Sequence, residues 1–244
     1  MQDKLDLEKT IDHWNDEFTN NARKPLQDLS KYSTESLEWL MMEHYQFSFA
    51  NCQFLWNAAE TAGAFDTDAV KNELIRNYKE ESGHAALYKL ALKKVGSDVD
   101  ARAEFTPTTQ FLKSIGEMCS LEPSAVLGFM FATETAAIFE HQVFLAVSEE
   151  VIARRNAGDA GKPLVGFHQM HLDGVEQSHK DELGIFLRGV YADAEVVPAE
   201  GNRPTIHTQQ ALDAGKKAIE TMKAWWAELF AELYAKNGLL AKAA

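Results

Sequence analysis

Apolar and polar residues mix along this chain without the strict alternation of a β-strand, and prolines and glycines gather mostly between long stretches. Each stretch has the length of a helix, and no run of β-branched residues is long enough to predict a strand. We predict helices over residues 3–22, 34–62, 67–95, 107–119, 123–156, 163–191 and 205–237. The pattern indicates an all-α fold, a single-domain bundle of about seven helices over residues 1–244.

Residues at the ends of these stretches support the assignment. Ser33 or Thr34 can cap the second helix, because a hydroxyl oxygen accepts a hydrogen bond from a free backbone N–H. Pro123 stands where a first-turn proline is favoured, and Gly96 follows the cationic end of the third helix. These helices therefore have recognisable starts and stops.

Two copies of the pattern Glu-x-x-His lie inside predicted helices, from Glu81 to His84 and from Glu176 to His179. Three residues turn an α-helix by about 300°, so a Glu and a His at this spacing share a face. A carboxylate and an imidazole on one face form half of a transition-metal site. Two such halves with further carboxylates hold metal pairs in helical bundles, so we interpret the motifs as parts of one two-metal site.

The first motif belongs to a polar stripe along its predicted helix. Asn77, Glu81, His84 and Tyr88 recur at helical spacing and share one face. A polar stripe aimed into a bundle is costly unless its groups are paired or bound to metal. Glu80 is adjacent, and we expect it to face solvent.

One glutamate stands nearly alone in the apolar helix predicted over residues 123–156. Glu134 lies between Phe131 and Ala136, in a stretch with few other polar residues. An isolated carboxylate there needs a partner, and we interpret it as a metal ligand. Glu140 lies six residues further, about 120° around the helix, and is the fallback ligand.

The second motif has an extra candidate upstream. His171 precedes Glu176 by five residues, which is about 140° of turn and out of phase for a shared ligand face. Gly174 lies between them, so a π-bulge or local unwinding is predicted there, and such bulges favour functional sites. His168 competes with His171, but we interpret it as a surface or core histidine.

Three further acidic residues are weaker candidates for ligands. Glu43 lies among apolar residues of the second helix, where a solvated face is the simpler interpretation. Asp173 and Asp181 flank the second motif and rank below it.

Charge and composition exclude some classes of function. The formal net charge is −13, which disfavours binding to nucleic acid or to an anionic membrane surface. The two cysteines form no C-x-x-C motif, which suits a reducing compartment. The first residues are polar, and no apolar run of about 18 residues occurs, so we expect a cytoplasmic protein without a membrane span.

The order of these motifs resembles the haem-oxygenase-like non-haem diiron oxidases, and most closely the decarboxylases that convert medium-chain fatty acids into terminal alkenes. The matching stretches are residues 77–84, 132–136 and 170–179, and the resemblance covers roughly residues 40–190. Two departures concern the last stretch. The family usually has three residues between the histidine and the acidic ligand, whereas four separate His171 from Glu176 here. The acidic ligand is also a glutamate, Glu176, where the family has an aspartate.

The resemblance implies a haem-oxygenase-like fold and two Fe(II) ions, with manganese as the alternative metal and O2 as co-substrate. It implies a small substrate that carries a carboxylate or an amine, such as a fatty acid or an amino acid. The reaction would be desaturation, oxidative C–C cleavage or N-oxygenation. An electron donor and a homodimer are compatible with this interpretation. The ligands implied are Glu81, His84, Glu134, His171, Glu176 and His179.

Three other functions compete with the oxidase. A ferritin-like metal-storage or redox protein would need Glu43 and would leave His171 spare. A metal-free, thiaminase-like hydrolase of the same fold would need a nucleophilic cysteine, and neither Cys52 nor Cys119 has a matching context. A haem oxygenase would need a proximal histidine near the N-terminus, for which His13 is available.

Overall fold

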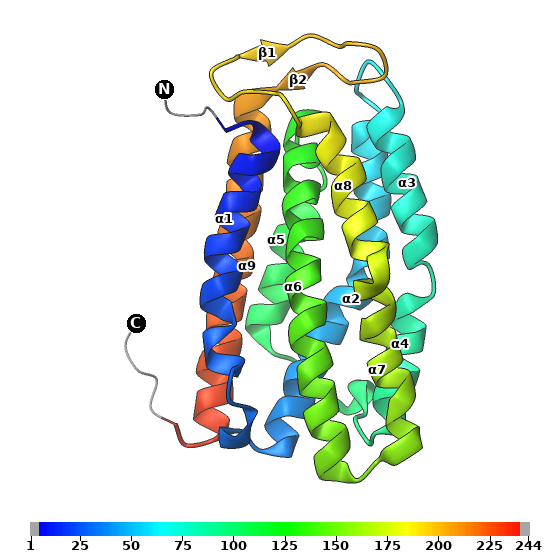
Figure 1. The fold of residues 1–244 in the computed structure, drawn as a ribbon, viewed down its shortest axis with the longest axis vertical. Coiled ribbons are helices and arrows are strands. Elements are labelled where there is room, and N and C mark those ends of the chain that lie inside the picture. Colours follow the sequence, from blue (N-terminus) through cyan, green and yellow to red (C-terminus); the bar gives the residue numbers. More distant parts are fainter. Residues whose placement is uncertain (1–4, 240–244) are drawn as a thin grey trace.

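In the computed structural model, which describes residues 5–239, long helices run side by side along one axis (Figure 1). Short 3₁₀ turns connect several of them, at Lys24–Leu26, Leu29–Lys31, Val99–Ala101 and Gly158–Gly161. The α-helices are α1 (Leu7–Ala22), α2 (Thr34–Ala62), α3 (Ala69–Glu81), α4 (His84–Lys94), α5 (Thr106–Met118), α6 (Pro123–Arg155), α7 (Lys162–Met170), α8 (Glu176–Leu187) and α9 (Thr208–Lys236).

Helix α6 is the centre of the bundle. It packs against α9, α2, α8, α1 and α7, and Figure 1 shows it between α1 and α9 on one side and α8 on the other. Buried residues occur on every face of its first five turns, from Ser124 to His141. A helix that is apolar all round must be enclosed, which explains why this segment became the core.

The predicted all-α fold is confirmed, and the boundaries of α2, α5 and α6 agree closely with the sequence prediction. The predicted start of the first helix at residue 3 lies outside the described residues. Helix α1 begins at Leu7. Asp6 is its N-cap, and the Asp6 side chain accepts a hydrogen bond from the Lys9 backbone N–H at 3.0 Å. Of the two residues proposed to cap α2, Ser33 is the cap, since its hydroxyl accepts from the Ser36 backbone N–H at 3.2 Å.

Two predicted long helices are interrupted. The prediction of one helix over 67–95 was wrong, because Gly83 adopts a left-handed φ of 97° between α3 and α4. The helix predicted over 163–191 is α7 and α8, joined by a π-helical turn at His171–Val175. This confirms the predicted distortion near Gly174, whose φ is 117°. Helix α8 ends at Leu187, earlier than predicted.

A short hairpin covers one end of the bundle, where the sequence predicted no strand. Strand β1 (Val196–Val197) pairs antiparallel with β2 (Ile206–His207) (Figure 1). Each strand has two residues, which is too short for an alternating pattern to be recognised. The pairing also delays the start of α9 from residue 205 to Thr208. Within residues 5–239, no helix is long and apolar enough to cross a membrane.

Helices α6 and α9 approach each other closely because glycines face the partner backbone. A Cβ on Gly128 would lie 2.6 Å from the carbonyl carbon of Ala211 and 2.8 Å from its Cα. A Cβ on Gly215 would lie 3.1 Å from the Gly128 carbonyl oxygen. The absence of side chains at these positions therefore sets the spacing of the two helices.

We expect Gly128→Ala to destabilise the protein by about 1–3 kcal/mol or more, because a rigid backbone must shift to admit the methyl group. The measurement is the free energy of unfolding in denaturant. Gly166→Ala is the matched control, since a Cβ on this exposed α7 residue meets no atom within 4 Å. It should be neutral or stabilising by about 1 kcal/mol at most. Equal effects at the two positions would contradict the proposed packing.

Candidate metal centre

The six residues predicted as ligands lie together in the core. Helices α3 and α4, helix α6 and the α7–α8 segment supply them, and all six are buried except His84, which is half-buried. All of them except His179 line a cavity of about 30 Å³. The residues lining it are His44, Phe47, Ser48, Asn51, Glu81, His84, Thr133, Glu134, Ala137, Glu140, His141, Phe167, His171 and Glu176.

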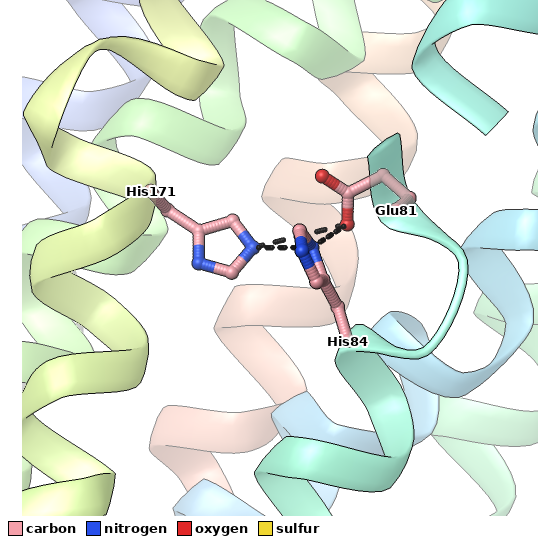
Figure 2. Close-up of side chains that lie close together, drawn as sticks. All are labelled: Glu81, His84 and His171. Carbon is pink, nitrogen blue, oxygen red and sulfur yellow. Dashed lines mark hydrogen bonds and ion pairs between the residues drawn. The ribbon is translucent and has the colours of Figure 1, made fainter. Parts of the chain in front are cut away.

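A break between two helices lies inside the first Glu-x-x-His motif. Glu81 is the last residue of α3 and His84 the first of α4, so they do not share one helical face as predicted. The turn at Gly83 instead brings His84 Nδ1 to 2.9 Å from Glu81 Oε2. Figure 2 shows His171 reaching the same point from the opposite segment, with its Nε2 3.2 Å from His84 Nδ1.

The rest of the predicted stripe faces elsewhere. Asn77 and Tyr88 are fully buried, but neither lines the cavity. The Tyr88 hydroxyl donates to the Met41 carbonyl oxygen at 3.4 Å and lies 3.3 Å from His44 Nδ1. Burial raises the pKa of Tyr88 well above its usual value. The stripe is therefore split between the candidate site and the polar interior beside it.

The π-helical turn aims His171 into the cavity. Its Nδ1–H donates to the Phe167 carbonyl oxygen at 2.7 Å, so Nε2 is the nitrogen directed into the cavity, 3.8 Å from Glu81 Oε2. The same Nε2 lies 4.0 Å from Glu176 Oε1. The extra residue between His171 and Glu176 is absorbed by the wider turn, so both face the cavity despite their awkward spacing. Asp173, in the same turn, is exposed.

Glu80 has a role that the sequence interpretation missed. It is partly exposed, as expected, but its Oε2 accepts a hydrogen bond from His179 Nε2 at 2.9 Å. Arg76 holds the carboxylate in turn, with Nη1 at 2.8 Å. His179 Nδ1 consequently points inward, 3.5 Å from Glu134 Oε2. The Arg76–Glu80 spacing of i, i+4 was visible in the sequence, but it did not indicate that a histidine 99 residues away completes the chain.

His141 was also missed. Its Nε2 lies 3.4 Å from Glu176 Oε1, and its ring stacks on that of His171 at 4.0 Å. Its Nδ1 lies 3.1 Å from Nδ1 of His168, which is a buried core histidine, one of the two interpretations given to it. His141 follows Glu134 by seven residues, two turns of α6, and this spacing was the available signal.

The weaker carboxylate candidates are engaged elsewhere. Glu140 lines the cavity, but it accepts a hydrogen bond from Trp226 Nε1 at 3.0 Å and lies 3.6 Å from His44 Nε2. The interpretation of Glu43 as a residue on a solvated face was wrong, because Glu43 is fully buried and pairs with Arg102 Nη1 at 2.7 Å. It does not line the cavity. Asp181 is exposed and accepts from Gln177 at 2.7 Å.

Burial of several carboxylates together sets the protonation of the site. Burial, reinforced by the charges of Glu134 and Glu81, raises the pKa of Glu176 well above its usual value. Burial lowers the pKa of His179, but the carboxylates around it, Glu134 first, outweigh burial and raise it to about 10. For Glu81, hydrogen bonds from His171 and His84 outweigh burial and lower the pKa to about 2.

The buried carboxylates and imidazoles form groups that could hold a metal ion. Three groups have their ligand atoms within 4.8 Å of one another: Glu81 with His84 and His171, Glu81 with Glu176 and His179, and His141 with His171 and Glu176. Among the described residues, buried Glu81 Oε1 and His179 Nδ1 have no hydrogen-bond partner. Mixed carboxylate and imidazole ligands suit iron, manganese or zinc, and Glu81 belongs to two groups, as a bridging carboxylate would.

Comparison with known proteins supports the fold. No protein-family model matches the sequence, and no curated protein is significantly similar to it. A CADD-like protein of unknown function from Nostoc punctiforme is 20% identical with a TM-score of 0.70, over 92% of this chain and 99% of that one. A domain of unknown function with a heme oxygenase-like fold from Shewanella denitrificans is 14% identical with a TM-score of 0.63, over 98% and 97%.

A TenA homolog from Pseudomonas syringae is also similar, with 13% identity and a TM-score of 0.64 over 90% of this chain and 92% of that one. At these identities the likeness concerns the fold alone. The chain therefore has the haem-oxygenase-like fold that the resemblance implied.

We expect Glu80→Gln to weaken metal binding about 10- to 100-fold, because the charged acceptor that orients His179 is lost. The measurement is anaerobic titration with Co(II), whose ligand-field absorption reports each bound ion. Glu73→Gln is the control, since Glu73 contacts Arg76 but not the histidine. Unchanged affinity in Glu80→Gln would show that this hydrogen bond does not position His179.

Metal affinity should rise with pH through the neutral range toward the pKa of His179, about 10. The pKa of His179 is raised to about 10, so this imidazole holds a second proton at neutral pH, and the raised pKa of Glu176 favours its protonated form. An incoming ion must displace these protons. Lower pH favours the protonated, metal-free form, so metal affinity increases as pH increases. Calorimetry in buffers of different ionisation enthalpy measures the protons released. A pH-independent affinity with no proton release would contradict this assignment of protonation.

Proposed function

We propose that this protein is a non-haem oxidase or oxygenase that binds two iron ions and uses O2 to oxidise a small substrate. The observation that carries the proposal is the buried cluster of carboxylates and imidazoles whose ligand atoms lie within 4.8 Å of one another, in which Glu81 Oε1 has no hydrogen-bond partner among the described residues. Burying such atoms without a partner costs free energy, which a bound cation would offset.

The two ions would divide the ligands. Glu81, His84 and His171 would hold one ion, and Glu134, Glu176 and His179 the other, with Glu81 reaching both. Manganese is the alternative metal for the same donors. When bound, iron ions of this kind supply the electrons that O2 chemistry requires.

The protein itself provides orientation and a dry enclosure. Apolar Phe47, Ala137 and Phe167 line the cavity beside the ligands, and they keep water from reacting there. At about 30 Å³ the cavity admits a molecule the size of O2 or water. A larger substrate needs the wall to open, and half-buried Ser48 and Asn51 of α2 are the side chains that line it toward the surface.

The charge of the cavity bears on the class of substrate. None of the residues that line it is a lysine or an arginine. A substrate carboxylate would therefore rely on the metal ions for its counter-charge, whereas an amine could pair with a glutamate. Ser48, Asn51 and Thr133 offer uncharged hydrogen bonds to either group. We propose a small carboxylate- or amine-bearing substrate, as the family resemblance implies.

The competing functions have less support. A ferritin-like site would need Glu43, which pairs with Arg102 outside the cavity lining. A thiaminase-like hydrolase would need a reactive thiol. Burial raises the pKa of Cys52, and raises that of Cys119 to about 12, and neither residue lines the cavity. His13, the candidate haem ligand, is exposed and pairs with Glu17.

Anaerobic titration with Fe(II) followed by exposure to O2 tests the proposal. We expect two irons per chain, a transient visible absorption after mixing with O2, and O2 uptake stimulated by the substrate. Glu81→Ala should weaken iron binding more than about tenfold, since it removes the shared carboxylate. Asp173→Asn is the matched control, because this exposed acidic residue lies in the same π turn as His171 and should leave iron binding unchanged.

Two outcomes would contradict the oxidase. Growth of a polynuclear ferric core would indicate metal storage. A protein that binds no iron, and whose Glu81→Ala variant retains all its properties, would indicate a metal-free function.

A further inference from the structure

Besides Glu134, and Glu140 which Trp226 engages, helix α6 presents His141 to the cavity as a further potential ligand. Glu134 and His141 are seven residues apart, which is two helical turns, and both line the cavity. Glu134 faces the α8 end, where His179 Nδ1 is 3.5 Å away. His141 lies one layer along the axis, beside Glu176 and His171.

The position of His141 requires an explanation beyond packing. Its ring stacks on that of His171 with an interplanar angle of 9°, and a phenyl ring would fill that stack equally well. An imidazole adds two nitrogen atoms that must be satisfied in a site where only 6% of the residue is exposed. The 3.4 Å distance from Nε2 to Glu176 Oε1 is long for a hydrogen bond.

The other nitrogen of His141 has a partner that suits a metal ligand. Nδ1 lies 3.1 Å from His168 Nδ1, so one of the two nitrogens donates to the other. If His141 donates, its Nε2 carries a lone pair directed at the cavity, and the proton on His168 is at Nε2. Histidines that bind metal generally donate their other N–H to such an acceptor. His168 Nε2 is buried with no hydrogen-bond partner among the described residues, so in this tautomer its N–H is unpaired, a cost that binding of a cation by His141 would offset.

We propose that His141 is a seventh ligand of the metal centre, binding through Nε2, and that His168 is its positioning residue. The proposal rests on the proposed function, since it concerns an ion in the same cavity. His141, His171 and Glu176 have ligand atoms within 4.8 Å of one another. The two groups that contain only predicted ligands meet the same distance limit.

A seventh ligand makes the two metal subsites unequal. His141 stacks on His171, which groups with His84 and Glu81, so His141 would add an imidazole beside this group while its Nε2 lies 3.4 Å from Glu176 Oε1. Glu134 and Glu176 give the side near His179 more carboxylate oxygen. Imidazole-rich sites bind later first-row metals more tightly, and carboxylate-rich sites suit manganese or magnesium. The two ions should therefore load in sequence, with the imidazole-rich subsite first.

Anaerobic titration with Co(II) tests the proposal on three variants beside the unmodified protein. We expect His141→Gln to weaken one of the two ions more than about tenfold and to shift its ligand-field absorption. His168→Phe removes only the orienting partner, and it should weaken the same ion about tenfold while both ions still bind. His207→Gln is the control, since this exposed histidine of strand β2 does not line the cavity, and it should leave both affinities unchanged.

X-ray absorption of the Co(II)-loaded unmodified protein provides a measurement that does not depend on any variant folding. The proposal predicts four imidazoles over the two ions, from His84, His141, His171 and His179. Three imidazoles, or an unchanged spectrum and affinity in His141→Gln, would overturn it while the two-metal oxidase stands. Failure of the unmodified protein to bind two ions would instead overturn the proposed function and this inference together.

Discussion

Mutual repulsion between buried carboxylates is the constraint on which the interior of this protein depends. Glu81, Glu134 and Glu176 are each less than a tenth exposed and meet in one cavity whose lining contains no lysine or arginine. Charges confined in a medium of low dielectric must be neutralised by protons or by cations. The raised pKa values of Glu176 and His179 show the first solution, and metal ions would provide the second.

Two interruptions of otherwise long helices deliver the side chains to that cavity. At Gly83 the chain passes from α3 to α4, and at Gly174 a π turn joins α7 to α8. Both breaks lie at the level where ligands are needed, one inside the first Glu-x-x-His motif and one just before the second. A regular helix would direct His171 away from Glu176. The irregular turn instead lets both side chains face the same cavity.

Outer contacts hold the inner imidazoles in the required orientation. His171 donates to the Phe167 carbonyl oxygen, and His179 donates to Glu80, which Arg76 supports. Each contact occupies one ring nitrogen and turns the other toward the cavity. The same logic applies to the pair of His141 and His168, so the centre is organised by two layers of polar residues rather than by one.

Features that depend on neighbours along the chain were determined by the sequence alone. The helical segments and the cap at Ser33 follow from local pattern, and the distortion near Gly174 follows from the awkward phase of His171. The two motifs and Glu134 were also recognisable, because polar residues in apolar helices are conspicuous. A local rule could not foresee the break at Gly83, since glycine is tolerated within helices and its conformation there depends on packing.

Roles that depend on distant segments were decided by the tertiary structure. Glu43 and Glu134 are both lone glutamates in apolar helices, yet Arg102 engages the first and His179 faces the second. Local spacing along the chain did not reveal the partners of Glu80 and His141, because these partners, His179 and Glu176, lie on another helix. Side chains of similar local context thus acquire different functions, because burial and charge are set by what packs against them in three dimensions.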